Sequence, residues 1–199
     1  PSGTLWARYN FGAKSNTECG KYYAWGETET KDVFSWSNYK YCDKGQNNSL
    51  TKYNSKSYYG KVDNKTNLEN KDDVMKIKCG YYYAIPTKKD WQELIDNCTF
   101  GYREEGITVQ GKHGEGPIFL PYSGYRSGFD LHDKGVDGYY WTSTLDSNSP
   151  DDAWFMHIGR GTCELNSYYR SQGRCIRPVM RKTNYKEAAD VRNAVVSTK

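Results

Sequence analysis

The clearest hydrophobic period in the chain predicts a helix that starts at Thr87. Thr87 suits the N-cap position, and Asp90, three residues later, suits the facing position of a capping box. Trp91, Leu94 and Ile95 then fall on one helical face. We therefore expect an amphipathic helix that packs on the core through these three side chains.

A shorter helix is expected near Asn70, where Asp72 and Asp73 would lie at the positive end of the helix dipole. Ahead of it, residues 28–71 are polar, rich in Asn, Lys, Ser and Tyr, and show no sustained period. That pattern predicts an extended, loop-rich insertion.

The C-terminal half has the pattern of short strands bounded by turn residues. We expect strands in the segments GPIFLPYSGYR, GYYWTST, DDAWFMHIG, CEL and RCIRPV, with residues 166–172 connecting the last two. Alternation in DDAWFMHIG puts Phe155 and His157 on one face and Trp154 and Met156 on the other. We expect Trp154 and Met156 to point inward, and Phe155 and His157 to point towards a ligand.

After Arg181 the sequence changes character, and KEAADVRNAVV has helical propensity. We therefore divide the chain into a domain, residues 1–181, and a tail or short helix, residues 182–199. A chain of 199 residues fits one domain of this size.

Composition changes how the polar pattern is interpreted. Hydrophobic residues make up only 36% and the mean hydropathy is -0.95, values that would suggest disorder in a chain poor in aromatics. Here 19 Tyr, 6 Trp and 6 Phe can supply a core, because each aromatic side chain buries a large area.

The distribution of charge and of apolar residues argues against two classes of partner. The net charge is +4, but Lys and acidic residues are mixed along the chain without a basic stripe, so we expect no nucleic-acid partner. No apolar run approaches the roughly 18 residues of a membrane span, so we expect no membrane insertion of this segment. We also expect no cofactor and no metal.

The six cysteines have no CxxC pair, which argues against a zinc site. Their even number permits three disulfides. The pair Cys163 and Cys175 is the first choice, because a separation of twelve residues suits two adjacent strands joined by a polar loop.

Seven segments occur in the order seen in the Fibrobacter major-paralogous-domain family: LWARYNFGA, CGKYYAWGETE, LENKDDV, AIPTKKDWQELI, IFLPYSGYR, GYYWTST and GRCIRPV. The chain resembles that family over roughly residues 5–179. The resemblance implies an α+β C-type-lectin fold of the branch shared with formylglycine-generating enzymes, loop-rich, with short strands and about two helices. It also implies an exported bacterial or phage protein that is secreted, held at the cell surface or carried on a phage particle.

A narrower resemblance involves residues 141–177, which are similar to the variable block of diversity-generating retroelement variable proteins. In that family, adenine-containing codons are rewritten just before a Gly-x-x-(Val/Ile)-Arg-Pro ending. Glu164 and Gln172 depart from the pattern, because neither arises from an Asn codon in this way. The resemblance implies that Arg170 is a scaffold residue and that these positions bind the ligand: Asp152, Phe155, His157, Gly159, Gly161, Thr162, Asn166, Ser167, Tyr168, Tyr169 and Ser171.

The residue types in this block independently suit binding. The stretch NSYYRSQ, residues 166–172, combines two Tyr and an Arg with small amides and hydroxyls. Tyr supplies contact area at low entropic cost, while Ser and Asn supply adaptable hydrogen bonds, as in antibody paratopes. We therefore expect a non-catalytic, adhesin-like module that binds a protein or glycan ligand on another cell or surface.

Three alternatives stay open. The tail after Arg181 could assemble a structural or pilus-type surface component. Cys163 and Cys175 could belong to an oxidase like the formylglycine-generating enzymes, although their spacing differs from that family. The acidic stretch DSNSPDD, residues 146–152, could hold calcium, but turn chemistry explains its composition equally well. We find no pattern of catalytic residues: Glu104 and Glu105 are adjacent and project differently, and the His residues lie in turn-like contexts.

Overall fold

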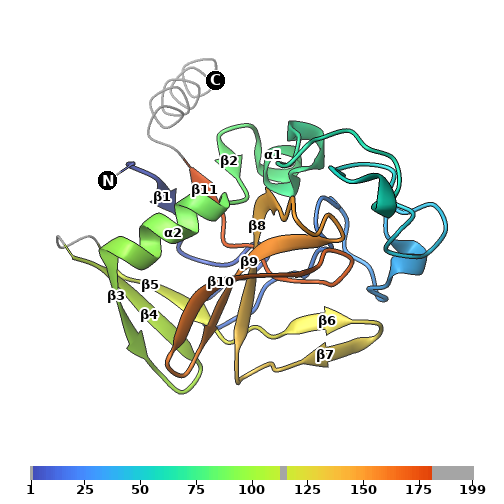
Figure 1. Ribbon diagram of the computed structural model, residues 1–199. Coiled ribbons are helices and arrows are strands. Elements are labelled where there is room, and N and C mark those ends of the chain that lie inside the picture. Colours follow the sequence, from blue (N-terminus) through green and yellow to red (C-terminus); the bar gives the residue numbers. More distant parts are fainter. Residues whose placement is uncertain (1, 113–115, 181–199) are drawn as a thin grey trace, which may run out of the picture.

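The computed structural model describes residues 2–112 and 116–180. The predicted C-terminal tail or helix lies outside these residues. Three sheets of three strands, one two-stranded sheet and two α-helices make up the described fold (Figure 1). The central sheet has the order β10-β9-β8, and all of its pairings are antiparallel. Its strands are β8 (Gly138–Leu145), β9 (Asp152–Gly159) and β10 (Thr162–Tyr169).

The smaller sheets surround the central one. A second sheet joins the two ends of the described chain to its middle, in the order β1-β11-β2. Its strands are β1 (Leu5–Trp6), β11 (Val179–Met180) and β2 (Tyr83–Ala84). The third is β3 (Cys98–Tyr102), β4 (Gly106–Gly111) and β5 (Ile118–Pro121), and the two-stranded hairpin is β6 (Tyr125–Ser127) with β7 (Asp130–His132).

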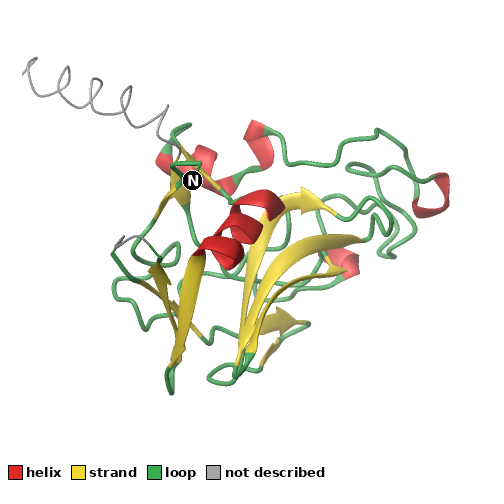
Figure 2. Ribbon diagram, turned by 60° about the vertical axis from the view of Figure 1, so that its left-hand side comes forward, coloured by secondary structure: helices red, strands yellow, loops and turns green. Residues whose placement is uncertain are grey.

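Both α-helices begin at capped ends. Thr87 caps α2 (Lys88–Asn97): its hydroxyl accepts a hydrogen bond from the Asp90 amide at 3.2 Å, and its own amide donates to Asp90 Oδ2 at 2.8 Å. The predicted start of this helix is confirmed. Asp73 caps the shorter helix α1 (Val74–Cys79) by accepting a hydrogen bond from the Met75 amide at 2.9 Å. Helix α2 lies across one face of the central sheet (Figure 2).

The core has two clusters, one on each face of β8 and β9. On the α2 side, Trp91, Met156 and Ile158 pack together with side chains of β4 and β5. On the opposite side, Trp141 and Phe155 pack with aromatic residues of the N-terminal loops. The central strand β9 is therefore covered on both faces, which its alternating sequence did not indicate.

The polar segment of residues 28–71 is loop-rich, as predicted, with short 3₁₀ turns at Trp36–Asn38, Ser57–Tyr59 and Asn70–Asp72. The fully buried Arg170 attaches this segment to the core. The Arg170 guanidinium donates hydrogen bonds to the Tyr53 carbonyl at 2.7 Å and the Lys52 carbonyl at 2.8 Å. These bonds make Arg170 a scaffold residue.

The prediction of an α+β C-type-lectin fold is wrong in its specific part. The described chain is mostly β, and its strands are divided among four small antiparallel sheets, two of which consist of strands of only two or three residues. This composition is compatible with the broad α+β class. The order of sequence segments suggested the fold but carried no information on how the strands pair.

Two further properties bear on the predictions. Within residues 2–112 and 116–180, no helix is long and apolar enough to cross a membrane.

All six cysteines lie in the described residues as free thiols. The predicted Cys163–Cys175 bridge is wrong, because β9 and β8 separate Cys163 from the segment of Cys175 that pairs with β8. Three strand spacings amount to about 14 Å, against the roughly 7 Å between Cα atoms that a disulfide can span.

Candidate functional site

A row of aromatic side chains lies where the β6–β7 hairpin meets the central sheet on the face opposite α2. We name it the aromatic face and define it by Tyr125, His132, Tyr139, His157 and Tyr168. The Tyr125 ring stacks on His132 with centroids 5.1 Å apart and meets Tyr139 edge-on at 5.1 Å. Tyr139 stacks on His157 at 4.8 Å with their planes 4° apart. The antiparallel register pairs Tyr139 directly with His157, which brings the two rings together.

Carboxylates flank His157 on both sides. His157 Nε2 lies 3.5 Å from Asp137 Oδ2, and Nδ1 lies 3.7 Å from Glu164 Oε1. Nε2 is buried and makes no hydrogen bond to any described residue. The Tyr139 hydroxyl donates to Asp133 Oδ2 at 2.9 Å; burial and this carboxylate raise the pKa of Tyr139. The aromatic face thus combines planar rings with hydrogen-bonding groups.

Arg174 lies beneath the aromatic face and is only 2% exposed. Its Nη2 donates to Gln172 Oε1 at 2.8 Å, while Nε is buried without a hydrogen-bond partner in the described chain. Among the described residues, no carboxylate approaches it within the 4.0 Å of an ion pair. Burial lowers the pKa of Arg174 to about 9. The floor of the site is therefore a buried cation.

Three aspartates lie at one end of the aromatic face. Asp146 accepts a hydrogen bond from Ser167 Oγ at 2.7 Å, and Asp151 accepts one from Asn47 Nδ2 at 2.7 Å. Burial, followed by the charges of Asp151 and Asp146, raises the pKa of Asp152 to about 7. No group of three or more His, Cys, Asp or Glu residues in the described segments is arranged to hold a metal ion.

Two exposed tyrosines complete this surface. Tyr168 is 49% exposed and Tyr169 is 38% exposed, and their ring centroids are 4.7 Å apart. Tyr169 also contacts Trp36 edge-on at 5.8 Å. The strand β10 carries both residues and forms the outer edge of the central sheet, with no strand of the described chain paired to its free side. A ligand can approach them from solvent.

Comparison with known proteins bears on this same region. Residues 109–179 match the family of a domain of unknown function, DUF8237. The match covers less than half of the chain but includes β5 to β10, Arg174 and the whole aromatic face. No curated protein and no solved structure matches the chain. The family match therefore shows which segment this chain shares with the family, and it assigns no activity to that segment.

The structure brings several predicted ligand-binding residues to this surface and excludes others. His157, Asn166 and Tyr168 lie on the side of the sheet that carries the aromatic face, and Asp152, Ser167 and Tyr169 lie at its acidic end. Gly161 and Thr162 are at the opposite end of β9 and β10, in and after the hairpin turn. Gly161 has a φ of 80°, which a glycine adopts without steric cost.

Three predicted positions are buried. Phe155 is 5% exposed and packs against Trp141 at 6.1 Å, so its predicted outward orientation is wrong. Gly159 and Ser171 are also buried. A Cβ added at Gly159 would lie 2.2 Å from Asp137 Oδ1, which leaves little room for a varied side chain. The expectation for Met156 is confirmed, since it is fully buried, whereas Trp154 is only half-buried beneath the Lys88 ammonium.

Sequence reasoning missed Tyr125, His132 and Tyr139. They precede residues 141–177, the block in which the sequence pattern predicted the ligand contacts, and they lie in the β6–β7 hairpin and the start of β8. The alternation in GYYWTST offered a signal, because it places Tyr139 and Trp141 on one face and Tyr140 on the other. The pairing of β8 with β9 was needed to show which face that is.

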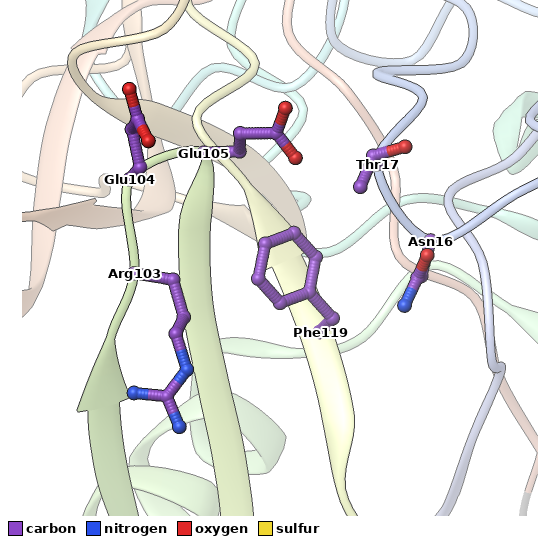
Figure 3. Close-up of a pocket in the computed structure, with 6 residues that line it drawn as sticks. All are labelled: Asn16, Thr17, Arg103, Glu104, Glu105 and Phe119. Atoms are coloured by element: carbon purple, nitrogen blue, oxygen red, sulfur yellow. The ribbon is translucent and has the colours of Figure 1, made fainter.

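A pocket of about 300 Å³ lies elsewhere and shares no residue with the aromatic face. Figure 3 shows its lining, which comes from an N-terminal loop, the β3–β4 turn and β5: Asn16, Thr17, Arg103, Glu104, Glu105 and Phe119. Cys163 and Cys175, the pair considered for an oxidase, do not meet here or at the aromatic face. The size of this pocket alone supplies no chemistry, so the aromatic face is the better candidate.

Proposed function

We propose that the chain is a non-catalytic, adhesin-like binding module whose aromatic face contacts a protein ligand on another cell or surface. One observation carries the proposal: rings of Tyr125, Tyr139 and His157 form a contiguous surface next to the half-exposed Tyr168. Large exposed aromatics with polar neighbours are typical of protein-binding surfaces.

The chemistry of the neighbouring side chains supports a protein rather than a small molecule. Asn166 and Glu164 project from β10 beside the rings, and Asn166 Nδ2 donates to Glu164 Oε1 at 2.9 Å. Adaptable amide and carboxylate groups around rigid rings suit varied polypeptide surfaces. A glycan ligand is the alternative outcome of the binding test below.

A second part of the proposal concerns how the residues of the binding surface would come to vary. We propose that the chain is a variable protein of a diversity-generating retroelement, exported to the cell surface or to a phage particle. The surface-facing positions His157, Asn166, Tyr168 and Tyr169 would then vary. Buried positions of the same block, such as Phe155 and Arg174, would stay fixed, because changes there would alter the core.

Sequencing the coding region of residues 138–181 across a natural population tests this extension. We expect substitutions at adenine-containing codons, concentrated at side chains that face solvent on β9 and β10. A block as invariant as residues 87–112 would refute diversification and leave an adhesin of fixed specificity. Variation spread equally over Phe155, Met156 and Arg174 would contradict the assignment of the surface.

Binding itself is tested with the fluorescently labelled chain on two probes: an array of bacterial surface proteins and an array of purified glycans. The proposal expects saturable binding to at least one protein, and Tyr168→Ala should weaken this binding at least 10-fold. Binding to glycans alone would refute the protein ligand and retain the aromatic face. Binding that is unchanged by Tyr168→Ala would refute the face itself.

A further inference from the structure

Cys19 and Cys175 are neighbours in the structure although 156 positions separate them in the chain. The buried Cys175 thiol donates a hydrogen bond to the carbonyl oxygen of Cys19, with Sγ 3.0 Å from that oxygen. The same carbonyl accepts a hydrogen bond from Asn10 Nδ2 at 2.9 Å. Asn10 is in turn fixed by Arg177, whose Nε donates to Asn10 Oδ1 at 2.9 Å.

The backbone on both sides holds the two cysteines together. Tyr23 and Arg174 exchange two backbone hydrogen bonds of 3.1 Å, so the segments that follow Cys19 and precede Cys175 run side by side. Gly20 has a φ of 77°, and a Cβ there would lie 2.4 Å from the Phe11 carbonyl oxygen. This turn requires glycine and sets the direction in which Cys19 enters the cluster.

Tyr22 interacts with both thiols. Burial raises the pKa of the Tyr22 hydroxyl, and Cys175 and Cys19 raise it further through charge and hydrogen bonding. Tyr22 Oη also donates to the Ser123 carbonyl at 2.5 Å, which holds the hydroxyl in place. A single fixed group therefore lies beside both sulfur atoms.

Cys163, Cys42 and Cys79 lack this arrangement. Cys163 lies across two strands from Cys175, too far for a bond. Cys42 is held in its own loop, where its Sγ is 3.0 Å from both the Gln46 carbonyl oxygen and Ser49 Oγ. Cys79 is exposed at the end of α1.

We infer that Cys19 and Cys175 form a disulfide when the chain folds in an oxidising compartment. The two thiols lose two protons and two electrons to a small-molecule disulfide, such as oxidised glutathione, which leaves as two thiols. Since Cys175 is inaccessible in the folded chain, the exchange takes place before the C-terminal strands close over it. The bond ties the N-terminal segment to the strand region that carries Arg174, and it is independent of the proposed binding function.

The test is to refold the full chain in a glutathione redox buffer, alkylate the remaining thiols, and map non-reduced peptides by mass spectrometry. We expect one cross-linked peptide pair that joins Cys19 to Cys175. The melting temperature should exceed that of the dithiothreitol-treated chain by about 10 °C, because the bond closes a long loop.

Two variants keep the inference falsifiable. Cys19→Ser, at a half-buried position, should abolish both the cross-linked peptide and the difference in melting temperature between oxidised and reduced samples. Cys163→Ser, the matched control, should retain both. Recovery of Cys175 in alkylated form after oxidative refolding, or its linkage to Cys163, would overturn the inference.

Discussion

The guanidinium of Arg174 lies over the ring of Phe155, with Cζ 4.1 Å from the ring centroid. It lies equally close to Trp141, at 4.3 Å. Cation–π contacts, together with hydrogen bonds that Arg174 donates to Gln172 Oε1 and to the Tyr169 carbonyl oxygen, therefore hold a buried charge that has no ion-pair partner in the described segments. The aromatic face rests on this arrangement, because Phe155 and Trp141 belong to the strands that carry His157 and Tyr139.

Shape rather than charge should dominate the contribution of Arg174 to stability. Arg174→Met keeps most of the side-chain volume and removes a desolvated cation, so we expect a loss of no more than about 1 kcal/mol in the free energy of unfolding. Arg174→Ala opens a cavity and should cost about 3 kcal/mol. Urea unfolding of both variants measures the difference. Equal losses would show that the charge itself is needed.

Stability should depend on pH through Asp152. Its folded-state pKa is raised from the usual 3.8 to about 7, so the folded chain binds a proton that the unfolded chain releases. The free energy of unfolding should therefore fall as the pH rises from about 4 to about 7, and level off above that. Asp152→Asn should be less sensitive to pH across this range in urea titrations. Asp130→Asn, at an exposed site, is the control and should follow the parent chain; an unaltered pH profile in Asp152→Asn would contradict the assignment.

Removing the cap of α2 should destabilise the helix that covers the central sheet. Thr87→Ala deletes the hydroxyl that accepts the Asp90 amide hydrogen bond, and we expect a loss of about 1 kcal/mol. Thr30→Ala, in an exposed loop, provides the comparison and should leave the free energy of unfolding within about 0.5 kcal/mol of the parent. Thermal or urea unfolding distinguishes them, and equal losses would mean that the capping bond contributes nothing.

Tyr168 should matter for binding and not for folding. Because half of its side chain is exposed, Tyr168→Ala should change the free energy of unfolding by less than about 1 kcal/mol. Binding to the protein probe that the parent chain recognises should weaken at least 10-fold, as truncation of an aromatic anchor does at other interfaces. Tyr81→Ala removes an exposed tyrosine ring just before β2, in a segment that contributes no residue to the aromatic face, and should bind like the parent. Equal weakening by both variants would point to non-specific adhesion.

Local structure followed from the sequence more closely than tertiary structure did. The α2 cap needed only Thr87 and Asp90, which are three residues apart, and Met156 was correctly placed in the core. Phe155 was misplaced because alternation describes a strand with one buried face, whereas β9 has neighbours on both faces. Residues 166–169 were taken for a connection, but their pairing with β9 makes them strand.

The candidate site was predictable only in part for the same reason. Tyr168 and His157 could be proposed from residue type and a family resemblance. Arg174 could not, because its role depends on Phe155 and Trp141 from two other segments. Similarly, the sequence spacing favoured Cys163 as the partner of Cys175, while the fold puts Cys19 there through contacts that span 156 positions.

The open edge of β10 also affects how the chain behaves at high concentration. Its outer row of backbone N–H and C=O groups is a template on which another extended chain can add, and eight residues without proline give that template considerable length. Glu164 is the one charged residue in this strand, and it is exposed. Its repulsion of an identical edge is thus the strand's own protection against self-association, so substitutions that neutralise position 164 carry a solubility cost separate from any effect on ligand recognition.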